Sequence, residues 1–181
     1  MLFRSEKDDT QRIYFFSERK NQKRLIEAFQ KLNLEDYELI LVGGKSKYSD
    51  QLFDNSPFGA GDFGGVRGLF AVPSTDLPAL YQGASLFVYP SFFEGFGIPI
   101  VEALHSGVPV VAASGSCLEE AGGNGALYAN PLDVNDLAEK MRQVLMNQTL
   151  RNDLILKGKE QVKQFSGERI AGQLMELYRE L

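Results

Sequence analysis

Chemically specialised residues are scarce in this sequence. Its 181 residues include one cysteine and one histidine, which excludes a disulfide framework and a zinc ribbon. The sequence has no Asp-x-Asp pair and no histidine cluster that would suggest a metal site. No apolar run approaches the ~20 residues that cross a bilayer, and the polar start lacks the apolar core of a signal peptide. We therefore expect a cytoplasmic protein without a metal site.

Positive charge is also missing from a large part of the chain. The totals of 19 basic and 24 acidic residues give a net charge of −5, which argues against binding to nucleic acid. Between Arg67 and Lys140 there is no lysine or arginine, whereas eight acidic residues stand there. The first 31 residues reverse this balance, with eight basic residues against five acidic ones. The sequence thus predicts an acidic protein whose basic N-terminal part can hold a small anion.

Apolar, β-prone runs alternate with segments whose apolar residues recur at helical spacing. The predicted strands cover residues 12–16, 37–42, 66–72, 85–89, 108–112 and 125–128. The predicted helices cover residues 21–32, 45–53, 77–82, 98–106, 134–146, 148–165 and 167–181. Strands that are apolar along their whole length belong in parallel sheets with helices on both faces. We therefore expect an α/β, Rossmann-like fold with a doubly wound parallel sheet of about six strands.

Domain organisation follows from the same pattern. Residues 1–10 are polar and are expected to form a flexible N-terminal segment, which leaves residues 11–181 as one domain. Doubly wound domains bind ligands at the carboxyl ends of their strands. Of the 18 glycines, 15 lie between Gly43 and Gly125, in the region of the strand-end loops. The ligand site is therefore expected in those loops.

Two carboxylates flank one of the predicted helix starts. Glu94 follows a strand in the segment Pro90-Ser-Phe-Phe-Glu-Gly-Phe-Gly, and Glu102 lies in the first or second turn of the helix that begins near Ile98. The free N–H groups of a helix start favour an anion or an oxygen-rich ligand, and carboxylates accept hydrogen bonds from paired hydroxyls. The segment therefore suits a phosphosugar. The alternative is that both acids only stabilise the helix dipole.

Two basic residues follow the first predicted strand. Arg19 and Lys20 stand in Ser17-Glu-Arg-Lys-Asn-Gln22, where the next helix opens. Arginine binds a diphosphate as a bidentate fork, and lysine binds it as a point charge. The alternative is a solvated basic helix start without a ligand.

The segment around Glu94 closely resembles the EGFG-centred E-x7-E motif of retaining GT-B glycosyltransferases, above all glycosyltransferase family 4. Further motifs follow this family in order: Leu77-Pro-Ala-Leu-Tyr-Gln-Gly-Ala84, Leu86-Phe-Val-Tyr-Pro-Ser91, Gly107-Val-Pro-Val-Val-Ala112, Glu120-Ala-Gly, Asn130-Pro131 and Phe165-Ser166. An R-K-N stretch of the family matches Arg19, Lys20 and Asn21. Roughly residues 11–180 resemble the C-terminal, nucleotide-sugar-binding domain, which is one half of a GT-B fold.

The resemblance implies roles for the residues around the helix start. Glu94 would be a catalytic residue that contacts the hexose hydroxyls of the donor. Glu102 would hold the ribose hydroxyls. The backbone amides around Phe96, Gly97 and Ile98 would meet the sugar or the diphosphate.

The resemblance also implies roles for the earlier strand ends. Arg19 and Lys20 would act as catalytic residues that stabilise the leaving diphosphate. Gly44 and Lys45 match a glycine turn that faces the donor in the family, so Lys45 would either reach a phosphate or point into solvent. Val72 ends the third predicted strand, where the family's base-binding backbone groups lie.

The function implied by the resemblance is that of a donor-binding domain in a group 1, mannosyltransferase-like enzyme. Such an enzyme transfers a hexose from a GDP- or UDP-sugar with retention at the anomeric carbon, and it needs no metal or tightly bound cofactor. A glycan or lipid-linked acceptor would bind an N-terminal domain missing from this chain, so we expect the isolated domain to be inactive. Peripheral membrane association of the full enzyme is compatible with this function, and nucleic acid is not an expected partner.

Two alternative functions stay open at this point. A non-catalytic nucleotide-sugar-binding module of the same fold is favoured by the short turn over residues 16–19, where the family has a longer turn with a glycine. A nucleotide-sugar epimerase has a similar architecture, but the EGFG stretch and the downstream motifs match glycosyltransferases better.

Overall fold

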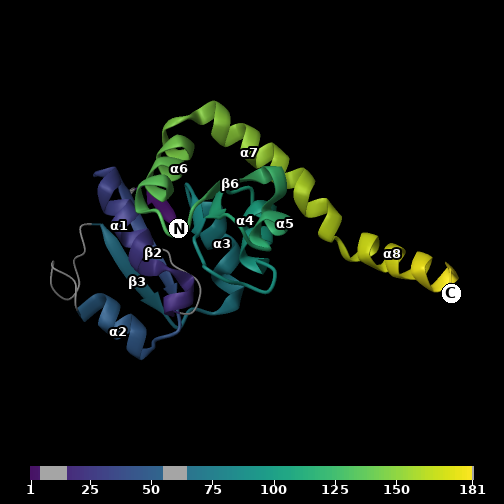
Figure 1. The fold of residues 1–181 in the computed structure, drawn as a ribbon, viewed down its shortest axis with the longest axis horizontal. Helices are drawn as coiled ribbons and strands as arrows, with labels where there is room; N and C mark the ends of the chain where they lie inside the picture. The colour runs from purple at the N-terminus through teal and green to yellow at the C-terminus, as the bar shows by residue number, and fades with distance from the viewer. Residues whose placement is uncertain (5–15, 55–64, 181) are drawn as a thin grey trace.

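Strands alternate with helices along the described chain, which comprises residues 1–4, 16–54 and 65–180 of the computed structural model (Figure 1). The strands are β1 (Leu2–Arg4), β2 (Tyr37–Gly43), β3 (Val66–Phe70), β4 (Phe87–Tyr89), β5 (Val110–Ala113) and β6 (Ala126–Ala129). The helices are α1 (Gln22–Leu32), α2 (Lys47–Asp54), α3 (Leu77–Gly83), α4 (Ile98–His105), α5 (Leu118–Gly122), α6 (Val134–Met146), α7 (Gln148–Gln161) and α8 (Gly167–Glu180). Short 3-10 turns are η1 (Glu18–Lys20), η2 (Ser74–Asp76), η3 (Gly123–Gly125) and η4 (Val162–Phe165).

The strands form two three-stranded sheets, in the orders β1-β2-β3 and β4-β5-β6. The pairs β2–β3, β4–β5 and β5–β6 are parallel, as the apolar strands predict, whereas β1 is antiparallel to β2. The Met1 amino group donates to the carbonyl of Ile40 at 3.1 Å, beside this pairing. Residues 1–4 therefore depart from the expected flexible segment 1–10, because backbone pairing with β2 orders them. Residues 5–10 lie outside the described residues.

Helices cover both faces of the sheets, because successive side chains of a strand point to opposite faces. Phe87 and Tyr89 of β4 belong to one buried cluster, together with Leu80 of α3. Val88, which lies between them, belongs to a second cluster with Phe29 of α1. The described part of the chain thus has a core on each side of the strands. This confirms the doubly wound α/β class and the prediction of parallel strands.

Most predicted elements are present, with ends displaced by a few residues. The predicted strand at residues 12–16 lies outside the described residues except for Phe16, which is buried and is not part of a strand. The predicted helix at residues 148–165 divides into α7 and η4. The short helix α5 was not predicted, because its five residues are too few to show a helical period.

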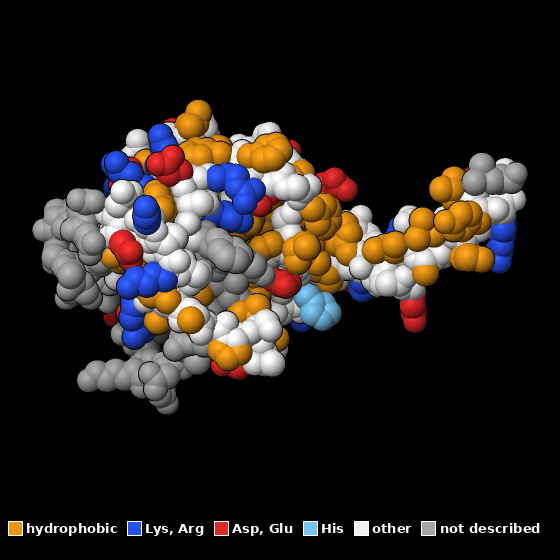
Figure 2. All heavy atoms as spheres, turned by 90° about the horizontal axis from the view of Figure 1, so that it is seen from below, with side chains coloured by type: hydrophobic (Ala, Val, Ile, Leu, Met, Phe, Trp, Pro, Cys, Tyr) orange, Lys and Arg blue, Asp and Glu red, His pale blue; other side chains and the backbone are white. Residues whose placement is uncertain are grey.

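The last helix, α8, extends away from the rest of the domain and carries the C-terminal end of the described chain (Figure 1). Figure 2 shows hydrophobic side chains gathered along this helix. They include five large exposed residues: Ile170, Leu174, Met175, Leu177 and Tyr178. Among the described residues, no helix is long and apolar enough to span a membrane.

One close backbone contact yields a test of the packing. A Cβ atom added to Gly125 in η3 would lie 2.5 Å from the Cα of Gly158 in α7. Because the atom that it would meet belongs to the backbone, no side chain can move aside to make room. We expect Gly125→Ala to lower the free energy of unfolding by about 1–3 kcal/mol, measured by urea denaturation.

A glycine on α8 supplies the control for that substitution. A Cβ atom on Gly172 would meet no heavy atom within 4 Å, and alanine is favoured over glycine in a helix by up to about 1 kcal/mol. Gly172→Ala should therefore leave the main unfolding transition unchanged or slightly stabilised. Equal destabilisation by both substitutions would contradict the role of the Gly125–Gly158 contact.

Candidate functional site

A partly buried ion pair joins η1 to the loop between β4 and α4. This loop, residues 90–97, is called the Glu94 loop below. The Lys20 Nζ lies 2.7 Å from Oε1 of Glu94, and the Arg19 Nη1 lies 3.3 Å from Oε2 of the same carboxylate. The side chains of Lys20 and Glu94 are only 11% and 10% exposed, whereas that of Arg19 is 50% exposed. The structure therefore brings together the three residues that the sequence predicts to be catalytic.

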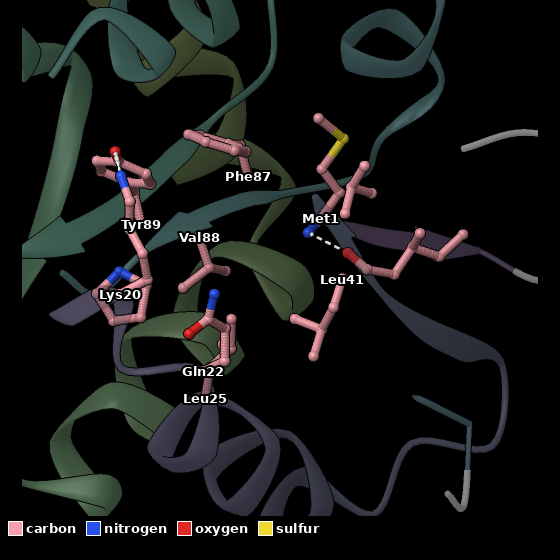
Figure 3. Close-up of a pocket in the computed structure, with 11 residues that line it drawn as sticks. Met1, Lys20, Gln22, Leu25, Leu41, Phe87, Val88 and Tyr89 are labelled. Atoms are coloured by element: carbon pink, nitrogen blue, oxygen red, sulfur yellow. Dashed lines mark hydrogen bonds between the residues drawn. The ribbon is translucent and has the colours of Figure 1, made fainter. Parts of the chain in front are cut away.

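Tyr89 also fixes the Lys20 ammonium. The Lys20 Nζ donates a hydrogen bond to the Tyr89 hydroxyl, and it lies 4.7 Å from the centroid of the Tyr89 ring. Figure 3 shows the two side chains meeting at the edge of a cavity between β2 and β4. This cavity, of ≈ 50 Å³, is far smaller than the ~300–1,000 Å³ of typical ligand pockets. The cavity is therefore too small to hold a ligand of ordinary size.

The charge of Glu94 is set by opposing effects. Burial disfavours the ionised carboxylate, but the hydrogen bond from Lys20 and the positive charges of Lys20 and Arg19 outweigh it. Together these contacts hold the pKa of Glu94 below its usual value. Glu94 is therefore a carboxylate at neutral pH and can accept hydrogen bonds from hydroxyls.

Backbone contacts hold η1 against the Glu94 loop. The Phe92 amide donates to the carbonyl of Arg19 at 2.9 Å, and the Arg19 guanidinium donates to the carbonyl of Phe93 at 3.1 Å. On the other side of the loop, the Cys117 thiol donates to the carbonyl of Glu94 at 3.1 Å. The loop that carries the carboxylate is thus held from two sides.

The start of α4 requires a glycine. Gly97 has a φ of 114°, and a Cβ atom there would lie 2.9 Å from Cδ2 of Leu118. The helix begins at Ile98, which is 62% exposed. Pro99 has no N–H group and the Ile100 amide donates to the carbonyl of Gly97 at 2.8 Å, so the Ile98 amide is the one in this first turn that a ligand could use. The Phe96 ring packs edge-on against Phe165, with centroids 5.3 Å apart. This contact fixes the position of the Phe96 ring beside the end of η4.

Glu102 lies one turn into α4 and is held by a tyrosine. The hydroxyl of Tyr81, on α3, donates to Oε2 of Glu102 at 3.0 Å. Tyr81 is only 1% exposed, while Glu102 is half-buried. The structure thus holds this carboxylate on the same helix whose start lies beside Glu94.

The remaining predicted residues lie at the ends of β2 and β3. Gly43 and Phe70 are partners in the parallel ladder, so Gly44 and Val72 leave the sheet at the same edge. The Ser46 hydroxyl donates to the carbonyl of Phe16 at 3.3 Å, which places the β2 end beside the residues that precede η1.

Lys45 belongs to the exposed surface in this structure. Its side chain is 72% exposed, and its Nζ lies 3.9 Å from Oδ1 of Asp50. Of the two orientations that the sequence leaves open for Lys45, the structure has the one that points into solvent.

Four supporting residues did not emerge from the sequence as part of the site. Asn21, Tyr81 and Tyr89 stand inside the matching motifs, but a motif does not say which neighbour a side chain holds. Cys117, the one cysteine of the chain, lies outside the motifs that carry charge, and its thiol contacts the Glu94 loop. In the described residues, no group of three or more His, Cys, Asp or Glu side chains could hold a metal ion.

Comparison with known sequences identifies the family. Residues 3–161 match the family model described as "Glycosyl transferases group 1". The chain is 40% identical over 164 residues to O-antigen chain mannosyltransferase B of Escherichia coli, covering 89% of this chain and 43% of that protein. It is 35% identical over 124 residues to D-inositol 3-phosphate glycosyltransferase of a Nocardioides strain, covering 67% of this chain and 27% of that protein.

Comparison with solved structures finds similar folds among sugar-transferring enzymes. Anabaena HepE, solved in complex with UDP and glucose, superposes with a TM-score of 0.77 at 25% identity, covering 92% of this chain and 46% of that one. Sucrose-phosphate synthase of Thermosynechococcus elongatus superposes with a TM-score of 0.75 at 27% identity, covering 91% and 43%. This chain therefore spans less than half the length of these relatives. Its sequence match and its fold place it among the group 1 glycosyltransferases, as one Rossmann-like half of a GT-B fold.

Proposed function

We propose that this chain is the donor-binding domain of a retaining glycosyltransferase of family 4, which transfers a hexose from a nucleotide-diphosphate sugar. The observation that carries the proposal is the cluster of Arg19, Lys20 and Glu94 beside the start of α4. Two cations and a helix start suit a diphosphate, and an ionised carboxylate suits sugar hydroxyls.

The charges of the cluster support stabilisation of a leaving diphosphate. Glu94 carries one negative charge against the two positive charges of Arg19 and Lys20, so the cluster keeps an excess of positive charge. Lys20 is nearly buried, and a charge is less screened there than in water. Such fixed groups stabilise charge that develops on a leaving group without having to reorganise. Glu94 acts by orienting the hexose, and we assign it no nucleophilic role.

We assign the other predicted residues to successive parts of a nucleotide sugar. Glu102 holds the ribose hydroxyls, and the amides around Phe96, Gly97 and Ile98 meet the sugar or the diphosphate. Gly44 and Val72, at the ends of β2 and β3, contact the nucleotide through their backbone. Lys45 is not needed for this assignment, because it points into solvent.

The donor sugar is proposed from two kinds of relative. The most similar curated relative reported above is a mannosyltransferase, which favours mannose from GDP-mannose. HepE was solved with UDP and glucose, which supports UDP-glucose as the competing donor. The acceptor, a glycan or a lipid-linked sugar, would bind a further domain, since the relatives are more than twice as long as the part matched here. A cytoplasmic site of action and transfer without a metal complete the proposal.

The alternatives named from the sequence are not favoured. A non-catalytic module was suggested by the short turn over residues 16–19, yet η1 presents both basic side chains to Glu94. The matched relatives are named as glycosyltransferases rather than epimerases.

Donor binding tests the proposal directly. We expect calorimetry of this chain to show saturable binding of GDP-mannose or UDP-glucose without added metal. Lys20→Ala and Glu102→Ala should each weaken that binding by about ten-fold or more, because each removes a charged hydrogen-bonding group worth roughly 1.5–3 kcal/mol.

A surface lysine serves as the matched control. The side chain of Lys157 on α7 is 51% exposed and pairs with Asp153, one helical turn away, so Lys157→Ala should leave donor affinity unchanged. Unaltered binding in both Lys20→Ala and Glu102→Ala would refute the site assignment.

The ion pair of Glu94 also gives a pH-dependent stability. Because the pKa of Glu94 is lower in the folded protein than its ordinary 4.5, its ionised form stabilises the fold above that pH, and the effect is lost as the pH falls below it. We expect Glu94→Gln to reduce the free energy of unfolding by about 1–3 kcal/mol at pH 7. The difference from the wild type should shrink below pH ~4.5.

Urea unfolding at pH 7 and at pH 3.5 measures this difference. Glu168→Gln, on the exposed helix α8, should change stability by less than about 0.5 kcal/mol at either pH. A deficit of the Glu94→Gln variant that stays constant with pH would show that the carboxylate charge is not what stabilises the site.

A further inference from the structure

Asn21 joins three loops of the site although its own side chain is 2% exposed and cannot reach a ligand. Its Nδ2 donates to the carbonyl of Pro90 at 3.1 Å and to the carbonyl of Pro131 at 2.7 Å. Pro90 begins the Glu94 loop, and Pro131 follows β6. One buried amide thus ties η1 to two strand-end loops that are distant in sequence.

The orientation of this amide is fixed by its third partner. The Arg24 Nη1 donates to Oδ1 of Asn21 at 3.3 Å, so the NH2 group must face the two carbonyls, which can only accept. Arg24 in turn lies 5.5 Å from the ring centroid of Phe92, in the Glu94 loop. All three polar contacts of Asn21 are therefore mutually consistent, and only an amide satisfies them together.

The backbone of Asn21 has a special conformation as well. Its φ of 58° and ψ of 30° lie in the left-handed region, which asparagine adopts more readily than most residues. Its amide donates to the carbonyl of Glu18 at 3.0 Å, and its carbonyl accepts from the Leu25 amide at 3.2 Å. The same residue therefore ends η1, begins α1 and anchors both to the Glu94 loop.

We propose that Asn21 is a positioning residue for diphosphate binding. By holding η1 against the Glu94 loop, it presents Lys20 and Arg19 in one arrangement before the donor arrives. Binding to groups that are already ordered costs less conformational entropy. Small displacements of such groups are costly, because an error of about 1 Å in placement can cost on the order of 100-fold in activity. This inference rests on the proposed function of Arg19 and Lys20.

Two substitutions separate the side chain of Asn21 from its backbone conformation. Asn21→Gly keeps the left-handed backbone accessible but removes all three side-chain contacts. Asn21→Asp keeps the shape and the contact with Arg24 but places a carboxylate against the carbonyls of Pro90 and Pro131. Asn33 offers the matched control, because it has a φ of 50° at the opposite end of α1 and is exposed.

The experiment is calorimetry of the full chain with GDP-mannose and with UDP-glucose, at low and at high salt. We expect Asn21→Gly and Asn21→Asp to weaken donor binding by at least about ten-fold with unchanged stoichiometry. Their binding should also depend less on salt than that of the wild type, because Arg19 and Lys20 contribute less attraction. Asn33→Gly and Asn33→Asp should stay within about two-fold of the wild type. A purely structural role would lower thermal stability without changing the salt dependence.

The possible outcomes separate the two proposals. Absence of donor binding by the wild type would overturn the proposed function, and the role of Asn21 with it. Wild-type binding together with unchanged affinity and salt dependence in Asn21→Gly would overturn the role of Asn21 alone. If neither Asn21 variant folds, NMR of the wild type decides the question. The Asn21 side-chain amide protons should exchange far more slowly than those of Asn33, and equally fast exchange would overturn the inference.

Discussion

The partly buried pairing of Lys20 with Glu94 is the interaction on which the arrangement of the site depends. Lys20 stands on η1, which leads into the helix that packs on β2, and Glu94 follows β4. Those strands belong to different sheets, so the pair links the two halves of the domain at the edge where we propose that the donor binds. An ion pair that is largely withdrawn from water adds little net stability compared with apolar packing. Its value lies in fixing which groups face each other.

The Glu94 carboxylate has two roles in the site: it holds two cations together, and it remains available as a hydrogen-bond acceptor. Lys20 and Arg19 keep Glu94 ionised despite its burial, and Glu94 keeps two cations close together despite their repulsion. A diphosphate would share these cations with Glu94 rather than find them isolated. Before any ligand binds, the site therefore has positive charge on the side of η1 and a hydrogen-bond acceptor for hydroxyls on the side of the Glu94 loop.

Much of the fold could be predicted from the sequence because local signals agree with the final packing. Apolar runs such as residues 37–42 and 108–112 can be satisfied only between two layers of helices, and the structure has them there. The pairing of β1 could not be predicted, because Leu2–Arg4 is too short and polar in its surroundings to show a strand pattern. In this case contact with β2 decides the conformation.

In the candidate site, too, some residues could be predicted from the sequence and others could not. The residues that carry charge, Arg19, Lys20 and Glu94, could be located from motifs, and the structure brings both cations within hydrogen-bonding distance of Glu94. The residues that hold them, Asn21 and Tyr89, could not be assigned from sequence. Their partners lie 69 positions or more along the chain, and no local pattern records such a contact.

The contact between the rings of Phe96 and Phe165 connects the segment before α8 to the Glu94 loop. Phe165 closes η4, and α8 begins two residues later and projects from the rest of the domain (Figure 1). Phe96 stands next to Gly97, where the backbone has no freedom to accept a side chain. Whatever packs against the exposed apolar side chains of α8 would therefore lie one ring contact away from the turn that precedes α4.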